Sequence, residues 1–141
     1  MKNIIICMAL VSLVSSISIK SMAETAPLET TRGAQGVRSV TSKSQLDQLI
    51  KEGYIAVDFY ADWCKPCQRL APIIAQLAQE YSNVQFAKVN VSTLKEISDA
   101  YNIQSIPVVI FFKNGKQAAK LGGLRDKNEY KRTLDALYPK Q

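Results

Sequence analysis

From residue 37 onward, short apolar runs typical of strands alternate with segments in which apolar residues recur every three or four positions. The strand-like runs are 37–40, 54–61, 84–91 and 108–112. After them, Asn114-Gly115 predicts a type I′ hairpin that leads into a fifth strand at 116–121. Because helical segments separate most of the strands, the pattern predicts an α/β domain with a parallel core, to which the closing hairpin adds antiparallel strands.

Four helices are predicted between and after these strands. Their apolar stripes are Leu46, Leu49 and Ile50; Leu70, Ile73, Ile74, Leu77, Ala78 and Tyr81, in a helix expected at 64–81; Leu94, Ile97 and Tyr101; and Tyr130, Leu134 and Leu137. Ser42 with Gln45, and Asp126 with Glu129, are typical of capped helix N-termini. Pro72 lies inside the second helix and is expected to kink it.

The beginning of the chain has a different pattern. Lys2 precedes an uncharged apolar stretch, and Ser21-Met22-Ala23 places small residues where signal peptidase cleaves. We therefore predict a signal peptide at 1–23, cleaved near Ala23/Glu24, with Cys7 in the discarded part. The apolar stretch is short for a bilayer span, so an uncleaved anchor is the less favoured alternative.

Residues 24–36 have no apolar period and are rich in Thr, Gly and Ala, which predicts a flexible lead-in. The folded domain is expected at 37–141. The composition of the whole chain is that of a soluble globular protein, since 47% of the 141 residues are hydrophobic and 21% are charged.

Charge and composition exclude several function classes. The chain has no histidine, which excludes imidazole-based nucleophiles, shuttles and metal sites. The net charge is +6, but the Lys and Arg residues are scattered, so nucleic acid is not an expected partner.

The candidate chemistry lies between the second strand and the second helix, at Cys64-Lys65-Pro66-Cys67. Two intervening residues on the first turn of a helix bring the two sulfurs within disulfide reach. Free N–H groups and the positive end of the helix dipole would stabilise a thiolate on Cys64, and we expect the Cys67 sulfur to be deeper. The pair therefore predicts an attacking and a resolving thiol.

Three other interpretations of the cysteine pair stay open. A purely structural disulfide across so short a loop would stabilise the fold little. A zinc site would need two further ligands, and the sequence has neither a histidine nor a second cysteine pair. The spacing by itself could also arise by chance.

Residues 57–67, Val-Asp-Phe-Tyr-Ala-Asp-Trp-Cys-Lys-Pro-Cys, resemble the active-site segment of the thioredoxins. Further matches follow in that family's order and spacing: Lys88-Val89-Asn90, Ile106-Pro107, Phe112-Lys113-Asn114-Gly115 and Gly122-Gly123. The resemblance covers nearly the whole predicted domain. It implies the thioredoxin fold, a central mixed five-stranded sheet flanked by four helices.

The resemblance implies a role for each matched residue. Cys64 would be the nucleophile and Cys67 the resolving thiol. Their reversible disulfide would carry the electrons, with no other cofactor and no metal. Asp58 would accept the proton of Cys67; burial in an apolar strand is itself expected to raise the pKa of this carboxyl. An exposed strand-edge Asp is the alternative. Lys88 would be the ion partner of Asp58, unless it snorkels at the sheet edge.

A second set of residues would contact the substrate: Trp63, Ile106, Pro107, Gly122 and Gly123. Pro107 would be cis and face the cysteines, or would merely start a strand. Trp63 would cover the disulfide, or be an ordinary half-buried aromatic. Pro66 is typical of reductants, because oxidants of this fold tend to carry His there.

The chain departs from the family pattern at two places. Lys65 stands where thioredoxins usually carry Gly; we expect it to be exposed and to favour acidic substrate segments. Val91-Ser92-Thr93 lacks the acidic residue that many relatives place there.

Together these features predict an exported, periplasmic thiol–disulfide oxidoreductase that reduces protein disulfides. We expect the protein to be a monomer. Because no cofactor motif is present, we expect its electrons to come from a membrane thiol transporter. The alternatives are a disulfide oxidase or isomerase of the same fold, and a non-catalytic binding module.

Overall fold

The computed structural model describes residues 36–138. The predicted signal peptide, the lead-in up to residue 35 and the last three residues lie outside the described part, so their predictions stay predictions. Between residues 36 and 138, no helix is long and apolar enough to cross a membrane. In the same stretch, no group of three or more Cys, Asp or Glu side chains is placed to hold a metal ion.

Five strands and four helices make up the described part of the domain. In chain order they are β1 (Val37–Ser39), α1 (Lys43–Ile50), β2 (Tyr54–Tyr60), α2 (Lys65–Glu80), β3 (Gln85–Asn90), α3 (Lys95–Ala100), β4 (Val108–Lys113), β5 (Lys116–Gly122) and α4 (Lys127–Leu137). The predicted order of strands and helices is confirmed, with differences of one or two residues at their ends.

The five strands form one mixed sheet in the order β1-β3-β2-β4-β5. β1, β3 and β2 are parallel, whereas β4 is antiparallel to both β2 and β5. This is the parallel core with a closing hairpin that the apolar pattern predicted. β2 lies at the centre, so the segment that precedes the cysteines is covered on both sides by neighbouring strands.

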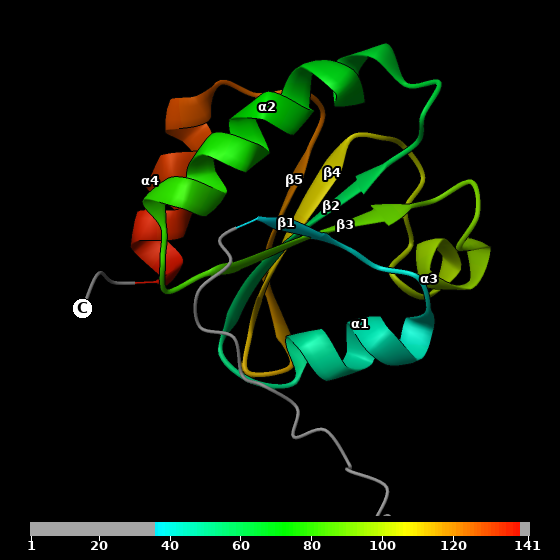
Figure 1. Cartoon of the computed structure of the whole chain (residues 1–141), viewed down its shortest axis with the longest axis horizontal. Coiled ribbons are helices and arrows are strands. Elements are labelled where there is room, and N and C mark those ends of the chain that lie inside the picture. Colours follow the sequence, from blue (N-terminus) through cyan, green and yellow to red (C-terminus); the bar gives the residue numbers. More distant parts are fainter. Residues whose placement is uncertain (1–35, 139–141) are drawn as a thin grey trace, which may run out of the picture. The chain divides into compact units, whose positions relative to one another are not determined.

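The helices form two layers, with α2 and α4 on one face of the sheet and α1 and α3 on the other (Figure 1). Successive strand residues point to opposite faces, and β2 follows this rule. Ala56 packs in the core under α2 and α4, while Val57 and Phe59 pack in the core under α1 and α3. By the same alternation Asp58 lies on the face covered by α2, which carries the cysteines.

The hairpin turn predicted at Asn114-Gly115 is present. Asn114 and Gly115 have positive φ values of 49° and 81°, as a type I′ turn requires. The Asn114 Oδ1 accepts a hydrogen bond from the Gly53 N–H at 2.9 Å, and the Gly115 N–H donates to the Ile50 carbonyl. These bonds join the hairpin to the connection between α1 and β2, and so fix the start of the central strand.

The two predicted helix caps are present, with one difference. The Asp126 Oδ1 accepts the Glu129 N–H at 3.0 Å, and the Ser42 Oγ accepts the Gln45 N–H at 3.2 Å. The Gln45 side chain, however, accepts the N–H of Thr41 instead of that of Ser42. The reciprocal half of this capping box is therefore displaced by one residue.

Candidate functional site

The two cysteines form a disulfide at the N-terminal end of α2. Cys64 is the N-cap residue of the helix and Cys67 lies in its first turn, with 5.3 Å between their Cα atoms. The Cys64 Sγ accepts a hydrogen bond from the Cys67 N–H at 3.2 Å. Pro66 occupies a first-turn position, where a missing N–H costs no helical hydrogen bond. The Cys64 sulfur therefore sits where helix N–H groups and the helix dipole favour negative charge.

The expected difference in depth between the two cysteines is very small. Their exposed fractions are 4% for Cys64 and 3% for Cys67, because both sulfurs belong to one disulfide packed among the same neighbours. Exposure therefore does not separate the attacking thiol from the resolving thiol. The position of Cys64 as the N-cap and hydrogen-bond acceptor is what distinguishes it.

Three of the residues predicted to contact substrate are joined beside the disulfide. Ile106 packs against the cluster formed by Ala61 and the two cysteines. The Ile106–Pro107 bond is cis, and Pro107 is buried directly before β4. The Pro107 carbonyl accepts the Gly123 N–H at 2.8 Å.

Gly122 completes this group through its pairing with Val108 in the sheet. Gly122 and Gly123 are exposed, so the backbone here is open to a partner chain. Whether these residues contact substrate stays a prediction.

Asp58 is buried without a full set of hydrogen bonds. Its residue is only 5% exposed, and its Oδ1 has no hydrogen-bond partner among the described residues. Burial raises the pKa of this carboxyl to about 7, although the charge of Lys88 opposes the shift. The alternative of an exposed strand-edge Asp is wrong, because β2 is the central strand. A carboxyl that titrates near neutral pH is suited to accept a thiol proton.

Lys88 lies on β3 directly in register with Asp58. Paired residues on neighbouring strands share a face of the sheet, so both side chains lie on the side of α2. No ion pair joins them within the part of the chain that the structure describes; the Lys88 Nζ lies 5.5 Å from the centre of the Tyr60 ring. Since β3 is an inner strand, the sheet-edge alternative for Lys88 is wrong. Lys88 therefore acts on Asp58 through its field instead of a direct salt bridge.

Trp63 is exposed, and a hydrogen bond holds its indole. The residue is 73% exposed, so the alternative of an ordinary half-buried aromatic is wrong. The Trp63 Nε1 donates to the Ser92 Oγ at 3.2 Å. That it covers the disulfide stays a prediction.

A small network holds the loop before the cysteines, and it was missed from the sequence. The Asn90 Nδ2 donates to the Asp62 Oδ2 at 3.0 Å, and the Asn90 Oδ1 accepts the Ser92 N–H at 2.9 Å. Ser92 in turn accepts the bond from Trp63. The available signal was the departure at 91–93. Where many relatives carry an acid, Ser92 offers a hydroxyl oxygen, which can also accept the N–H of the indole.

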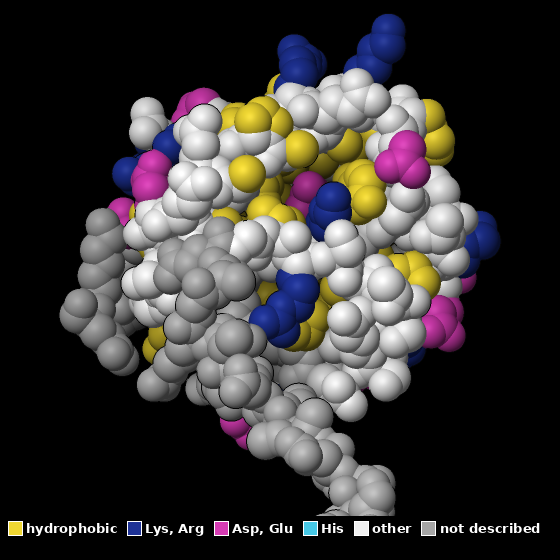
Figure 2. Space-filling view, viewed as in Figure 1, with side chains coloured by type: hydrophobic (Ala, Val, Ile, Leu, Met, Phe, Trp, Pro, Cys, Tyr) yellow, Lys and Arg dark blue, Asp and Glu magenta, His cyan; other side chains and the backbone are white. Residues whose placement is uncertain are grey.

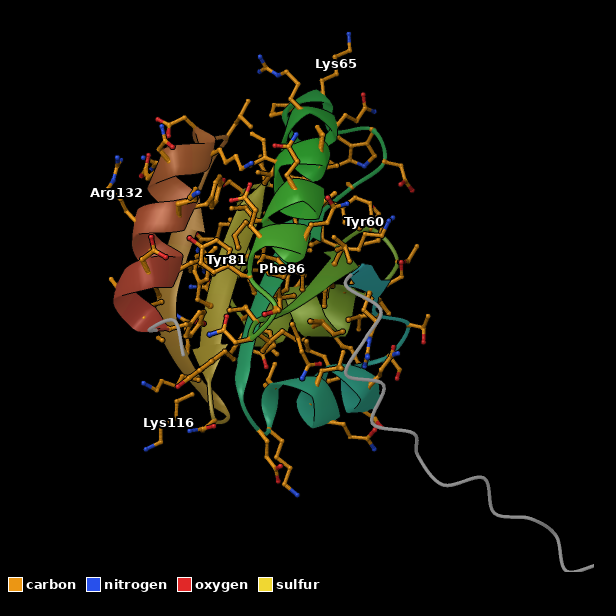
Figure 3. The ribbon with its side chains drawn as sticks, turned by 60° about the vertical axis from the view of Figure 1, so that its left-hand side comes forward. Tyr60, Lys65, Tyr81, Phe86, Lys116 and Arg132 are labelled. Atoms are coloured by element: carbon orange, nitrogen blue, oxygen red, sulfur yellow. A yellow bond between two sulfur atoms is a disulfide. The ribbon has the colours of Figure 1, made fainter. Side chains whose placement is uncertain are left out.

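Lys65 is exposed at the first position of α2, as expected. Figure 3 shows its side chain reaching away from the domain into solvent at the end of the sheet where α2 begins. Its charge therefore lies where other molecules can reach it.

Comparisons with known proteins agree on one family. A family model described as thioredoxin matches residues 37–136. A thioredoxin of Mycoplasmoides gallisepticum is 46% identical over 99 residues, which are 70% of this chain and 99% of the relative. A thioredoxin of Rickettsia bellii is 41% identical over 92 residues, which are 64% of this chain and 88% of that protein.

Solved structures show the same fold. A mutant thioredoxin from Halobacterium salinarum is 29% identical, with a TM-score of 0.71 over 76% of this chain and 94% of that one. The thioredoxin of Fasciola hepatica is 33% identical, with a TM-score of 0.67 over 71% of this chain and 98% of that one. The predicted thioredoxin fold is confirmed.

Asp58→Asn is expected to change how stability depends on pH. The folded-state pKa of about 7 lies above the ordinary value of 3.8, so the unfolded chain loses this proton first as pH rises. Wild-type stability therefore falls between those two values and the loss is complete above the folded-state pKa, where it is on the order of 4 kcal/mol. Urea unfolding of both disulfide-intact proteins from about pH 4 to pH 9 measures the difference, which should grow in favour of the variant up to about pH 7 and then level off.

The matched control is Asp99→Asn, at an exposed acid on α3. Its difference from wild type should not follow this course. Parallel pH curves for wild type and Asp58→Asn would show that folding does not raise the pKa of this carboxyl above its ordinary value.

Proposed function

Because this chain belongs to the thioredoxin family, we propose that it is an exported protein-disulfide reductase. Membership and the close cysteine pair make it a thiol–disulfide oxidoreductase of the thioredoxin type. The observation that carries the proposal is the Cys64 sulfur at the start of α2, where it accepts the Cys67 N–H. The substrates are disulfides of other proteins.

The proposed reaction is a two-electron exchange of disulfides. The Cys64 thiolate attacks one sulfur of the substrate disulfide, a mixed disulfide forms, and the other substrate sulfur leaves as a thiolate. Asp58 then accepts the Cys67 proton, and the Cys67 thiolate attacks the Cys64 Sγ. The Cys64–Cys67 disulfide forms, the mixed disulfide breaks, and the second substrate sulfur also leaves as a thiolate. The two substrate thiolates take up protons from solvent, and Asp58 returns its proton to solvent.

The chemistry before Cys67 supports reduction over oxidation. Pro66 carries no charge and no donor, so it adds nothing to the stabilisation of the Cys64 thiolate by the helix end. A less stabilised thiolate makes the dithiol form less favoured and the protein more reducing. The Cys64–Cys67 pair itself carries the electrons, and we propose no further cofactor.

The support for the proposed cellular location and for the proposed electron donor is the sequence before residue 36. A charged start, an apolar stretch and small residues at Ala23 support export and cleavage near Glu24. An exported reductase needs electrons from the other side of the membrane, so we propose a membrane thiol transporter as the donor. We further propose that the protein acts as a monomer in the periplasm.

Cysteine variants test the nucleophile assignment. In insulin reduction with dithiothreitol, the wild type should accelerate precipitation of the insulin B chain, and Cys64→Ser should not. Cys67→Ser should accumulate mixed disulfides with insulin, visible on non-reducing gels, because the resolving thiol is missing. Trapping by Cys64→Ser instead would reverse the assignment, and no acceleration by the wild type would favour a binding module.

The reduction potential tests the direction. Equilibration with glutathione should give a value nearer to the ~−270 mV of thioredoxin-type reductants than to the ~−120 mV of the strong periplasmic oxidant. The reduced fraction can be followed through the fluorescence of Trp63, the single tryptophan. A potential above about −180 mV would assign the protein to the oxidases or isomerases.

The mature N-terminus tests export. Protein isolated from the native cell envelope is expected to begin at Glu24, by N-terminal sequencing or intact mass. An N-terminus at Met1 in the membrane fraction would show a retained anchor. Unprocessed protein in the cytosolic fraction would contradict export altogether.

A further inference from the structure

Two exposed cations lie one helical turn apart near the N-terminal end of α2, the helix end that carries the disulfide. Lys65 is the first residue of α2 and Arg69 follows four positions later, so the two side chains lie on the same side of the helix. Neither belongs to any ion pair found between residues 36 and 138. Figure 2 shows Lys and Arg side chains standing out over the N-terminal half of α2, next to hydrophobic side chains.

These two cations do not serve the stability of α2. The start of a helix favours acidic side chains, and like charges four residues apart repel each other. The first turn of α2 has no acidic residue, whereas the first turn of α4 has Glu129, which Arg125 contacts at 3.1 Å. The charges on α2 therefore cost some helix stability, and their position near the helix end that carries the cysteines needs another explanation.

The surroundings leave these charges open to a partner. Asp62 is the acid nearest to them in the sequence, and its Oδ2 already accepts a hydrogen bond from Asn90. Trp63 stands between Asp62 and the cysteines with 73% of its surface exposed, and Ser92 holds its indole. This end of the domain thus combines an exposed aromatic ring with two cations that form no ion pair in the described part of the domain.

We propose that Lys65 and Arg69 recognise an acidic segment next to the disulfide of the substrate protein. The proposal rests on the proposed function, since the substrate must bring its own disulfide to Cys64. Lys65 directly follows Cys64, so chain that flanks the substrate disulfide meets the first turns of α2. Asp or Glu side chains there gain two exposed ion pairs, while Lys or Arg side chains are repelled. Such exposed contacts act mainly on the association rate and weaken with salt.

A set of three disulfide peptides tests the proposal. They differ only in the residues that flank the disulfide, which are Glu, Gln or Lys. The second-order rate constant for oxidation of the reduced protein is measured by stopped-flow fluorescence of Trp63. At low ionic strength the wild type should react about ten-fold faster with the Glu peptide than with the Lys peptide, and the ratio should fall to about two-fold in concentrated salt.

Two double variants decide which charges matter. Lys65→Gln with Arg69→Gln should bring the ratio to within about two-fold at low salt. The matched control, Lys116→Gln with Arg132→Gln, removes the same charge from exposed positions on β5 and α4 and should keep the wild-type ratio. Lys116 lies at the end of the domain opposite Lys65, and Arg132 on the outer side of α4 (Figure 3).

Several outcomes would overturn the proposal. Equal rates for the Glu and Lys peptides, a ratio unaffected by salt, or a ratio retained in the Lys65/Arg69 variant would each do so while leaving the proposed function intact. Failure to reduce even the Gln peptide would overturn both. Binding to phosphatidylglycerol vesicles that the Lys65/Arg69 variant loses, together with no peptide preference, would assign the cations to a membrane surface instead.

Discussion

The chemistry of this protein depends on where α2 begins. Helix N-termini leave backbone N–H groups without helical partners, and here the N-cap residue that accepts one of them is a cysteine. The same turn that starts the helix therefore prepares Cys64 to carry negative charge. Cys67 lies within disulfide reach because it belongs to that first turn. The reactive pair thus follows from the start of a helix packed behind a central strand.

The sheet supplies the second requirement, a carboxyl that is hard to ionise. Asp58 lies on the central strand under α2, and burial raises its pKa to about 7. Lys88 limits that shift from the neighbouring strand, while the Tyr60 ring lies near its ammonium group. A fully apolar residue would suit this position better for stability. The carboxyl is instead suited to a proton transfer near neutral pH, which the proposed resolution step needs.

The outer rim of the site differs from its interior in burial and in charge. Inside, Ala61 and Ile106 pack with the two cysteines, which are almost fully buried. Outside, Trp63, Lys65 and Arg69 are exposed, and Asn90 and Ser92 hold the loop beside them. The interior therefore serves thiol chemistry, and the exposed rim is free to select among substrates. The Lys65 side chain belongs to the exposed side of the site, because it points into solvent and away from the domain (Figure 3).

Local sequence patterns determined the elements and the reactive pair. These patterns act over a few residues, so they can be identified without knowing the tertiary structure. They are the apolar periodicity, the Asp126 cap, the Asn114-Gly115 turn and the cysteine spacing. Contacts between distant segments could not be derived in this way. The register of Asp58 with Lys88 and the bond from Trp63 to Ser92 join residues 29 or more positions apart. Whether a carboxyl is buried, or an aromatic ring exposed, depends on which segments pack over it, and that was decided only by the tertiary structure.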